Sequence, residues 1–417
     1  MRRLTVNSLL RRAGNLLLFA ILATGLLGSA FLSGFAVAWG MHPAPSRTRS
    51  AAPAVTTPAA PPQDLQQAFG IFWEAWKLVQ EEYYGEIPAP QTVVYGAVRG
   101  ALQTLGDPYT SFIEPKIARI LEEDASGQFE GIGALVRMNR DNKLEIVRVF
   151  EGSPAQKAGI RAGDLVIEVN GQSIVGYSIY EAVALIRGPA DTSVTLTIER
   201  PGQREPLRVT VTRARITIPV VEARMLPENI AYIRLLDFSA QATRQLQEQL
   251  KGLLAQNPRG LILDLRDNPG GFLDQAIQVA DLFLDEGVIA YERTKDGEER
   301  VFRSKSGDIG EKIPMVVLVN AGSASATEIV AGALQDRGRA RLIGERTFGK
   351  GSVQLVHTLS DGSELRVTIA RWFTPSNRAI HGEGLKPDIE VKAEPGAETG
   401  GVDPQLQRAV EVLLQGQ

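Results

Sequence analysis

The strongest constraint on this chain lies near its start, where residues 16–40 carry no charge and are mostly apolar. About 20 such residues in a helix span the hydrocarbon core of a bilayer, so the run predicts one transmembrane segment. The arginines that precede it are Arg2, Arg3, Arg11 and Arg12. By the positive-inside rule they keep the first residues in the cytoplasm, and everything after the segment is exported. The alternative is a cleaved signal peptide, since Ala36-Val37-Ala38 resembles a cleavage site.

A linker and a helical part follow. Residues 43–62 are rich in Pro, Ala, Ser and Thr, which cannot bury a core and predict an extended tether. Asp64 is a suitable N-cap for a helix with one apolar face, which we expect to belong to the core. The residues of that face are Leu65, Phe69, Phe72, Trp73, Trp76 and Val79. A second helix is predicted over residues 92–105, ended by Gly106-Asp107-Pro108.

Composition excludes several classes of chemistry. The chain has no cysteine, which excludes disulfides, thiolate metal sites and a cysteine nucleophile. It has three histidines, His42, His357 and His381, and no H-E-x-x-H helix, so we expect neither a metal nor another cofactor. The formal net charge of −3 offers no basic excess to neutralise phosphates, so we expect no nucleic-acid partner.

Residues 126–213 change to short runs rich in Val, Ile and Thr, which predict a β-rich segment. The predicted strands are residues 144–150, 165–169, 194–199 and 207–212. Between the first two lies G-S-P-A-Q-K-A-G-I-R-A-G-D, followed by an Asn170-Gly171 turn. This order of short helix, Gly-Asp turn and Asn-Gly hairpin closely resembles bacterial PDZ domains. The simpler alternative is that the segment is only a glycine-rich hairpin.

The PDZ resemblance implies a peptide-binding groove. Gly131, Ile132, Gly133 and Ala134 resemble the loop whose backbone N–H groups bind a terminal carboxylate, while the next strand edge pairs with the peptide. Ala134 stands where some PDZ loops carry a bulky residue, which predicts a differently shaped pocket. Residues 180–187 are expected to form the helix beside the groove. Arg187 at its end is expected to be a surface charge, with a regulatory contact to the core as the alternative.

Beyond residue 215, strands and helices alternate, which favours a layered α/β core. The predicted strands are residues 230–235, 260–265 and 315–319, and the predicted helices are residues 240–254, 273–283 and 326–334. Two strand-to-helix junctions carry small residues: D-L-R-D-N-P-G-G, ending in Gly270 and Gly271, and N-A-G-S-A-S-A-T-E around Ser325. Ser325 lies where a helix begins, so N–H groups and the positive end of the helix dipole face a developing oxyanion. The alternative is that Ser325 is only an N-cap.

Lys350 and Gln354 lie four residues apart and share a face in a strand or a helix. A lysine acts as a base only when it is neutral, so its pKa must fall, and desolvation is the usual cause. Gln354 could orient the amine by a hydrogen bond. The alternative for Lys350 is a solvated loop lysine.

Together these segments resemble the C-terminal processing peptidases, or tail-specific proteases. The resemblance runs from about Asp64 to H-G-E-G-L-K-P-D at residues 381–388 and includes D-P-Y-T at residues 107–110. It implies a Ser325–Lys350 dyad supported by Gln354. It also implies an oxyanion hole from the backbone of Ala326 and of Gly271 or Gly270, with Gly271 favoured.

The fold implied is a multidomain α/β (α+β) protein with an inserted PDZ domain. The predicted parts are a cytoplasmic stub and membrane segment (1–40), a linker (41–63), an N-terminal helical part (64–117), the PDZ domain (118–213), the peptidase core (214–394) and a C-terminal linker and helix (395–417). The function implied is a serine endopeptidase in the bacterial cell envelope. It would cleave proteins near free C-terminal tails from the periplasmic side of the inner membrane, or as a secreted protein.

Several alternatives remain. Ser323 is the rival nucleophile, and a Ser-His-Asp peptidase would need His357 or His381 as its base. A membrane-tethered PDZ scaffold that binds tails without cutting them is the non-enzymatic reading. The C-terminal run of Leu406, Ala409, Val410, Leu413 and Leu414 could pair with another subunit in a homo-oligomer.

Overall fold

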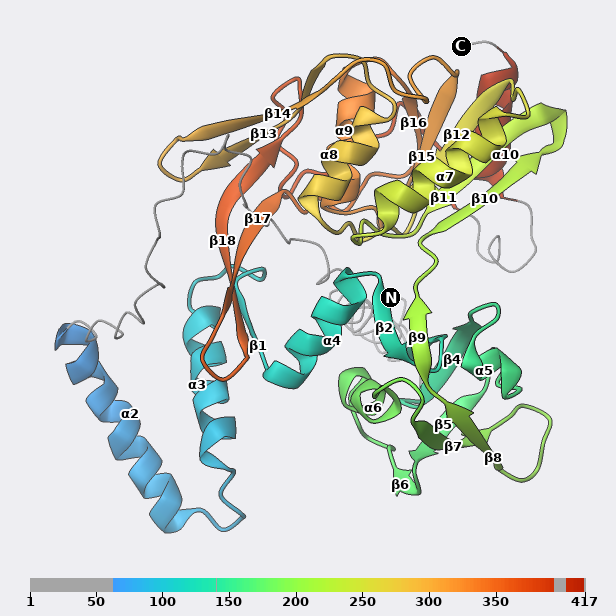
Figure 1. Ribbon diagram of the computed structural model, residues 1–417. Coiled ribbons are helices and arrows are strands. Elements are labelled where there is room, and N and C mark those ends of the chain that lie inside the picture. Colours follow the sequence, from blue (N-terminus) through green and yellow to red (C-terminus); the bar gives the residue numbers. More distant parts are fainter. Residues whose placement is uncertain (1–62, 140, 394–402, 416–417) are drawn as a thin grey trace, which may run out of the picture. The chain divides into compact units, whose positions relative to one another are not determined.

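The computed structural model describes residues 63–139, 141–393 and 403–415, and the chain divides after Pro108 into two compact units (Figure 1). The predicted membrane segment and most of the predicted linker lie outside the described residues. Within the part that is described, no helix has both the length and the apolar character needed to cross a bilayer.

The first unit contains two helices, α2 (Gln63–Glu82) and α3 (Pro90–Gln103), close to the two predicted ones. The apolar face of α2 was expected in the core, and that prediction is wrong. Trp73 is 63% exposed and Phe69 is 43% exposed, although Phe72 packs edge-on against Trp73 with ring centroids 5.1 Å apart. The physical reason is that the described residues of this unit form only two helices, which do not make a second layer to cover such a face.

The second unit begins at Tyr109 and contains the PDZ domain and the peptidase core. In the PDZ domain an antiparallel sheet has the strand order β3-β4-β5-β7-β8, with β6 beside β5. Its strands are β3 (Ala134–Met138), β4 (Leu144–Val149), β5 (Leu165–Val169), β6 (Gln172–Ser173), β7 (Ser193–Glu199) and β8 (Leu207–Thr212), and its helices are α5 (Pro154–Lys157) and α6 (Ile179–Ile186). The alternating residues of these strands form a core of their own, separate from that of the peptidase.

A two-stranded stem carries the PDZ domain. The chain enters it through β2 (Gln128–Gly131) and leaves through β9 (Ala214–Thr217), which pair antiparallel. Just before the stem lies α4 (Pro115–Ala125). Arg187 was predicted as a surface charge, and that prediction is wrong. Its guanidinium contacts Glu123 of α4 at 3.0 Å and also pairs with Asp124. A regulatory contact of Arg187 to the peptidase core stays a prediction.

The peptidase core is built on a six-stranded sheet in the order β10-β11-β12-β15-β16-β19, parallel except for the β10–β11 pair. Its strands are β10 (Val221–Leu226), β11 (Ile230–Leu235), β12 (Gly260–Asp264), β15 (Met315–Val319), β16 (Arg341–Gly344) and β19 (Ile389–Glu390); the short η1 (Pro227–Asn229) links the first two. Every residue of β12 and β15 is buried, as expected for central strands covered on both faces.

Helices cover the two faces of this sheet (Figure 1). α7 (Ala242–Leu254), α8 (Leu273–Asp281) and α9 (Ala326–Asp336) pack on the face that presents alternate residues such as Leu261 and Val317. α10 (Pro404–Leu414) packs on the other face. Most of the apolar run of α10, which we noted could pair with another subunit, is therefore covered within the chain. A homo-oligomer stays a prediction.

The second unit also contains a second sheet, which the sequence did not lead us to expect. It is antiparallel, in the order β1-β18-β13-β14, with β17 also beside β18. Its strands are β1 (Ser111–Ile113), β13 (Gly287–Thr294), β14 (Glu299–Ser304), β17 (Ser352–Thr358) and β18 (Glu364–Phe373). This sheet matters for function because Gln354 lies on β17 and Lys350 lies in the loop just before it.

Candidate active site

Ser325 lies at the junction between β15 and α9, and its backbone is strained. The residue has φ of +58° and ψ of −117°, a conformation that L residues rarely adopt and that tends to persist at functional sites. The next residue, Ala326, is the first residue of α9, so the helix N-terminus begins directly behind the serine. The side chain is buried, with 5% of the residue exposed.

Glu328 joins the serine to the lysine loop. Its carboxylate oxygen Oε2 accepts hydrogen bonds from the backbone N–H of Ser325 at 2.9 Å and from that of Lys350 at 2.8 Å. Its other oxygen accepts from the Thr347 hydroxyl at 2.5 Å and from the Gly349 N–H at 2.8 Å. Burial raises the pKa of Glu328, while these four donors oppose that rise.

This role of Glu328 was missed in the sequence. The signal was present, because Ser325 and Glu328 have the spacing of a capping box, in which the residue at the third helical position accepts from the N-cap backbone. What the spacing does not reveal is that the same carboxylate also binds a loop more than twenty residues further along the chain.

Lys350 lies between Gly349 and Gly351, in a loop held by the late H-G-E-G segment. The Gly382 N–H donates to the Gly349 carbonyl at 2.9 Å. A Cβ at position 351 would lie 2.3 Å from the backbone nitrogen of His381, so only glycine allows this close approach. The two segments thus fix the backbone on both sides of Lys350.

The amine of Lys350 is held in surroundings that disfavour its charge. The residue is 4% exposed. Burial, assisted by the positive charge of Arg366 and opposed by Glu328, lowers the pKa of Lys350 to about 8. The alternative of a solvated loop lysine therefore does not describe this residue.

Gln354 is buried on β17, and its side-chain nitrogen donates to the hydroxyl of Ser352 at 2.7 Å and to that of Thr368 at 3.3 Å. Ser352 is two residues from Lys350, so these bonds brace the turn that carries the lysine. A direct hydrogen bond between Gln354 and the amine stays a prediction.

The backbone around the double glycine distinguishes the two candidate oxyanion donors. The Gly270 N–H donates to the side chain of Asn268 at 2.9 Å and is therefore engaged. Among the described residues no acceptor is found for the N–H of Gly271 or for that of Ala326. These two amides remain as candidate donors, and the structure argues against Gly270.

Asn268 is a second residue that the sequence reasoning missed. Its side chain is fully buried and also donates to the Leu235 carbonyl at 2.8 Å. Its carbonyl accepts from the Ala324 N–H at 3.0 Å and from the Thr327 hydroxyl at 2.9 Å. Asn268 therefore ties the double-glycine turn to the segment that carries Ser325.

The rival residues have other roles in the structure. The Ser323 hydroxyl is fully buried, donates to the Leu265 carbonyl at 2.8 Å and accepts from the Asn320 N–H at 3.0 Å, which joins two strand ends. His357 is exposed on β17. His381 has its Nδ1 2.8 Å from Nη1 of Arg371.

The predicted carboxylate-binding loop is the connection from β2 to β3. Gly131 ends β2, Ala134 begins β3, and no acceptor among the described residues is found for the N–H groups of Ile132 and Gly133 between them. Gly133 has φ of +80°, and a Cβ there would lie 2.5 Å from that of Ser153. β3 is an edge strand of its sheet, so its outer edge is open to an added strand.

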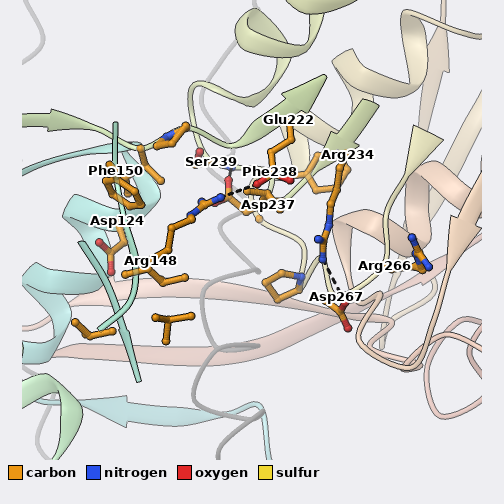
Figure 2. A pocket seen from close by; sticks show the side chains of 18 of the residues that line it. Asp124, Arg148, Phe150, Glu222, Arg234, Asp237, Phe238, Ser239, Arg266 and Asp267 are labelled. Carbon is orange, nitrogen blue, oxygen red and sulfur yellow. Dashed lines mark hydrogen bonds and ion pairs between the residues drawn. The ribbon is translucent and has the colours of Figure 1, made fainter. Parts of the chain in front are cut away.

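A cavity of about 1260 Å³ joins this loop to the double-glycine turn. It is lined by apolar residues of the PDZ domain, among them Ile132, Ala134 and Val183, and it extends to Gly271 in the core. Figure 2 shows an ion pair across it, in which Arg148 of β4 meets Glu222 of β10 at 2.6 Å. The lining of the cavity does not include Ser325, Ala326 or Lys350, and of the two candidate oxyanion donors it reaches only Gly271.

The chain is similar to known proteins over most of its length. The model described as peptidase family S41 matches residues 229–391, and a PDZ domain model matches residues 145–200. The carboxy-terminal-processing protease of Bartonella bacilliformis is 40% identical over 335 residues, which are 79% of this chain and 76% of that protein. The carboxy-terminal processing protease CtpA of Bacillus subtilis is 40% identical over 322 residues, 77% of this chain and 68% of that protein.

A crystal structure described as an S41 protease of Bacteroides fragilis has a TM-score of 0.52 to this chain, at 18% identity, and covers 83% of this chain and 97% of the other. At that identity it shows the fold alone, and the inserted PDZ domain of this chain rests on the PDZ domain model. The scaffold interpretation without catalysis is therefore set aside, and the chain belongs to peptidase family S41, as a serine peptidase of the C-terminal processing proteases.

Proposed function

We propose that this protease cleaves extracytoplasmic proteins near their C-termini, with Ser325 as nucleophile and Lys350 as base. One observation carries the assignment. A single oxygen of Glu328 accepts from the backbone nitrogens of both residues, at 2.9 and 2.8 Å, so those nitrogens lie within about 6 Å of each other. The lysine so placed is buried and has a pKa lowered to about 8, as a general base near neutral pH requires.

The reaction is acyl transfer. Neutral Lys350 takes the hydroxyl proton of Ser325 as the serine oxygen attacks the peptide carbonyl. The resulting oxyanion accepts hydrogen bonds from the N–H groups of Gly271 and Ala326. The Lys350 ammonium then gives its proton to the leaving amine as the C–N bond breaks, and water hydrolyses the acyl-enzyme by the same base. Gln354 braces the lysine loop through Ser352.

The PDZ domain selects the substrate through its free tail. The terminal carboxylate binds at the N–H groups of Ile132 and Gly133, and the last residues pair with the edge of β3. The cavity that runs from this loop to Gly271 is the path by which a bound chain reaches the oxyanion donors. The expected substrate is therefore a protein whose C-terminal segment is extended and ends in a free carboxylate.

The proposed location follows from residues 16–40, as an inner-membrane anchor or a cleaved signal of the bacterial envelope. Fractionation of cells, with protease treatment of spheroplasts, tests it. We expect the catalytic part to be accessible from the periplasmic side; protection from added protease in intact spheroplasts would contradict the proposal.

Incubation with an unfolded protein tests the chemistry. Wild type is compared with Ser325→Ala, Lys350→Ala and Ser323→Ala, and fragments are mapped by mass spectrometry. We expect cuts near the C-terminus that vanish in the first two variants and persist in the third. Retention of cleavage in Lys350→Ala would remove the dyad from the mechanism. A substrate with an amidated tail is expected to be cut more slowly; equal rates would show that the PDZ groove does not select.

A further inference from the structure

The D-P-Y-T segment at residues 107–110 has no role in the mechanism above, yet its tyrosine lies beside the proposed base. The amine nitrogen of Lys350 is 5.5 Å from the centroid of the Tyr109 ring. Cations within about 6 Å of an aromatic ring face are attracted by its quadrupole. The ring is therefore close enough to stabilise the charged form of Lys350 relative to its neutral form.

The backbone next to Tyr109 is fixed to the sheet that carries the lysine loop. The Thr110 hydroxyl accepts from the Thr368 N–H at 3.1 Å. β1, which begins at Ser111, pairs antiparallel with β18, placing Ser111 opposite Arg366. β18 in turn pairs with β17, directly after Lys350. Tyr109 is thus attached to the same framework as the amine.

The Tyr109 ring also contacts the ring of His381. The two rings form an edge-to-face pair with centroids 5.8 Å apart and an interplanar angle of 72°. A guanidinium has only donors, so the 2.8 Å contact between Arg371 and Nδ1 of His381 makes Nδ1 an acceptor. The imidazole thus lies between the Arg371 guanidinium and the Tyr109 ring.

The surroundings of Lys350 explain why such a ring is useful. The charged groups that act on the amine are Arg366, which disfavours its protonation, and Glu328, which favours it. Burial also disfavours the ammonium, and beyond some point a lysine with too low a pKa is too weak to accept the serine proton. An aromatic face stabilises the ammonium without supplying a group that could itself take the proton.

We propose that Tyr109 is a positioning residue for Lys350, whose ring face stabilises the ammonium that forms when the lysine takes the Ser325 proton, and that His381 holds this ring in place. The proposal rests on the proposed function, because it requires Lys350 to be the base.

The test is the pH profile of kcat/KM for the full chain with Tyr109→Phe and Tyr109→Leu. Leucine remains apolar but lacks the ring, so the ammonium loses stabilisation. We expect the acid limb to move to lower pH by about half a unit to one and a half units, and the plateau to fall about 2- to 30-fold. Phenylalanine keeps the ring and is expected to retain the wild-type limb. Tyr291→Leu is the matched control, since Arg293 lies 5.6 Å from that ring in the same sheet.

A second measurement guards against misfolding of the leucine variant. Phenylalanines with increasing fluorination at position 109 keep the shape of the ring and weaken its quadrupole, so the limb should move to lower pH in steps. A limb that stays in place throughout the series, or that moves equally for Tyr109→Phe and Tyr109→Leu, overturns the proposal. Full activity of Lys350→Ala overturns the proposed function instead, which separates the two failures.

Discussion

Replacing Lys350 with methionine should abolish cleavage and, at neutral pH, make the protein more stable. Methionine fills a similar volume without a charge. In the folded chain burial lowers the pKa of Lys350 from 10.5 to about 8. Below pH 8 the folded state therefore carries a buried ammonium that the unfolded state solvates in water, and this lowers the free energy of unfolding.

The size of the effect follows from the shift. A difference of about 2.5 pKa units corresponds to about 3 kcal/mol, at about 1.4 kcal/mol per unit. Between pH 8 and 10.5 the unfolded chain binds the proton and the folded chain does not, so wild-type stability rises with pH across this window. The advantage of Lys350→Met is thus full below pH 8, shrinks through the window and is absent above it.

Denaturant unfolding of wild type and Lys350→Met at pH 7 and at pH 10.5 measures this, with Lys251→Met, at an exposed position of α7, as the control. The same shift predicts that kcat/KM of the wild type rises with pH up to about 8, because Lys350 is neutral in only roughly one molecule in ten at pH 7. A profile that stays flat from pH 5 to 9, or an equal stability change at both pH values, would refute the reasoning.

Three further changes test the framework around the dyad. Glu328→Gln keeps the shape of the side chain but replaces one carboxylate oxygen with an NH2 group that cannot accept, so two of the four donors lose their acceptor. We expect kcat to fall about 10- to 100-fold with KM little changed in steady-state kinetics. Asn268→Ala releases the Gly270 N–H and should lower kcat about 100-fold, comparable with loss of an oxyanion donor, while calorimetry separates this from unfolding. Gly133→Ala places a Cβ 2.5 Å from that of Ser153, so KM should rise for a free-tailed substrate and stay unchanged for an amidated one.

Local sequence patterns correctly predicted the strands that are continuous apolar runs. The strand over residues 230–235 and the strand over 315–319 have the predicted bounds, because continuous apolar runs between turn residues indicate buried strands. The antiparallel sheet around β18 was not predicted. Its strands alternate buried and exposed residues irregularly and carry bulges, for example between Val353 and Gln354, so their period is weak.

The aromatic face of α2 shows a different limit. Its helical spacing is the same in a buried and an exposed helix, so the pattern predicts that a face is apolar and does not identify what covers it. In the described residues Trp73 and Phe69 remain largely exposed. The C-terminal run is the reverse case, since its face is covered by the sheet of the same chain.

The candidate dyad depends on backbone contacts that no spacing in the sequence encodes. Ser325 and Lys350 follow different strands, and side-chain chemistry alone would allow each to be a cap or a solvated charge. They become a pair because Glu328 accepts from the backbone of both. His381, in turn, leaves room only for glycine at position 351 and closes on the Tyr109 ring. The glycines and the late H-G-E-G segment are therefore as necessary to a neutral, fixed amine as the lysine itself, and substitutions there should impair kcat before they impair binding of the tail.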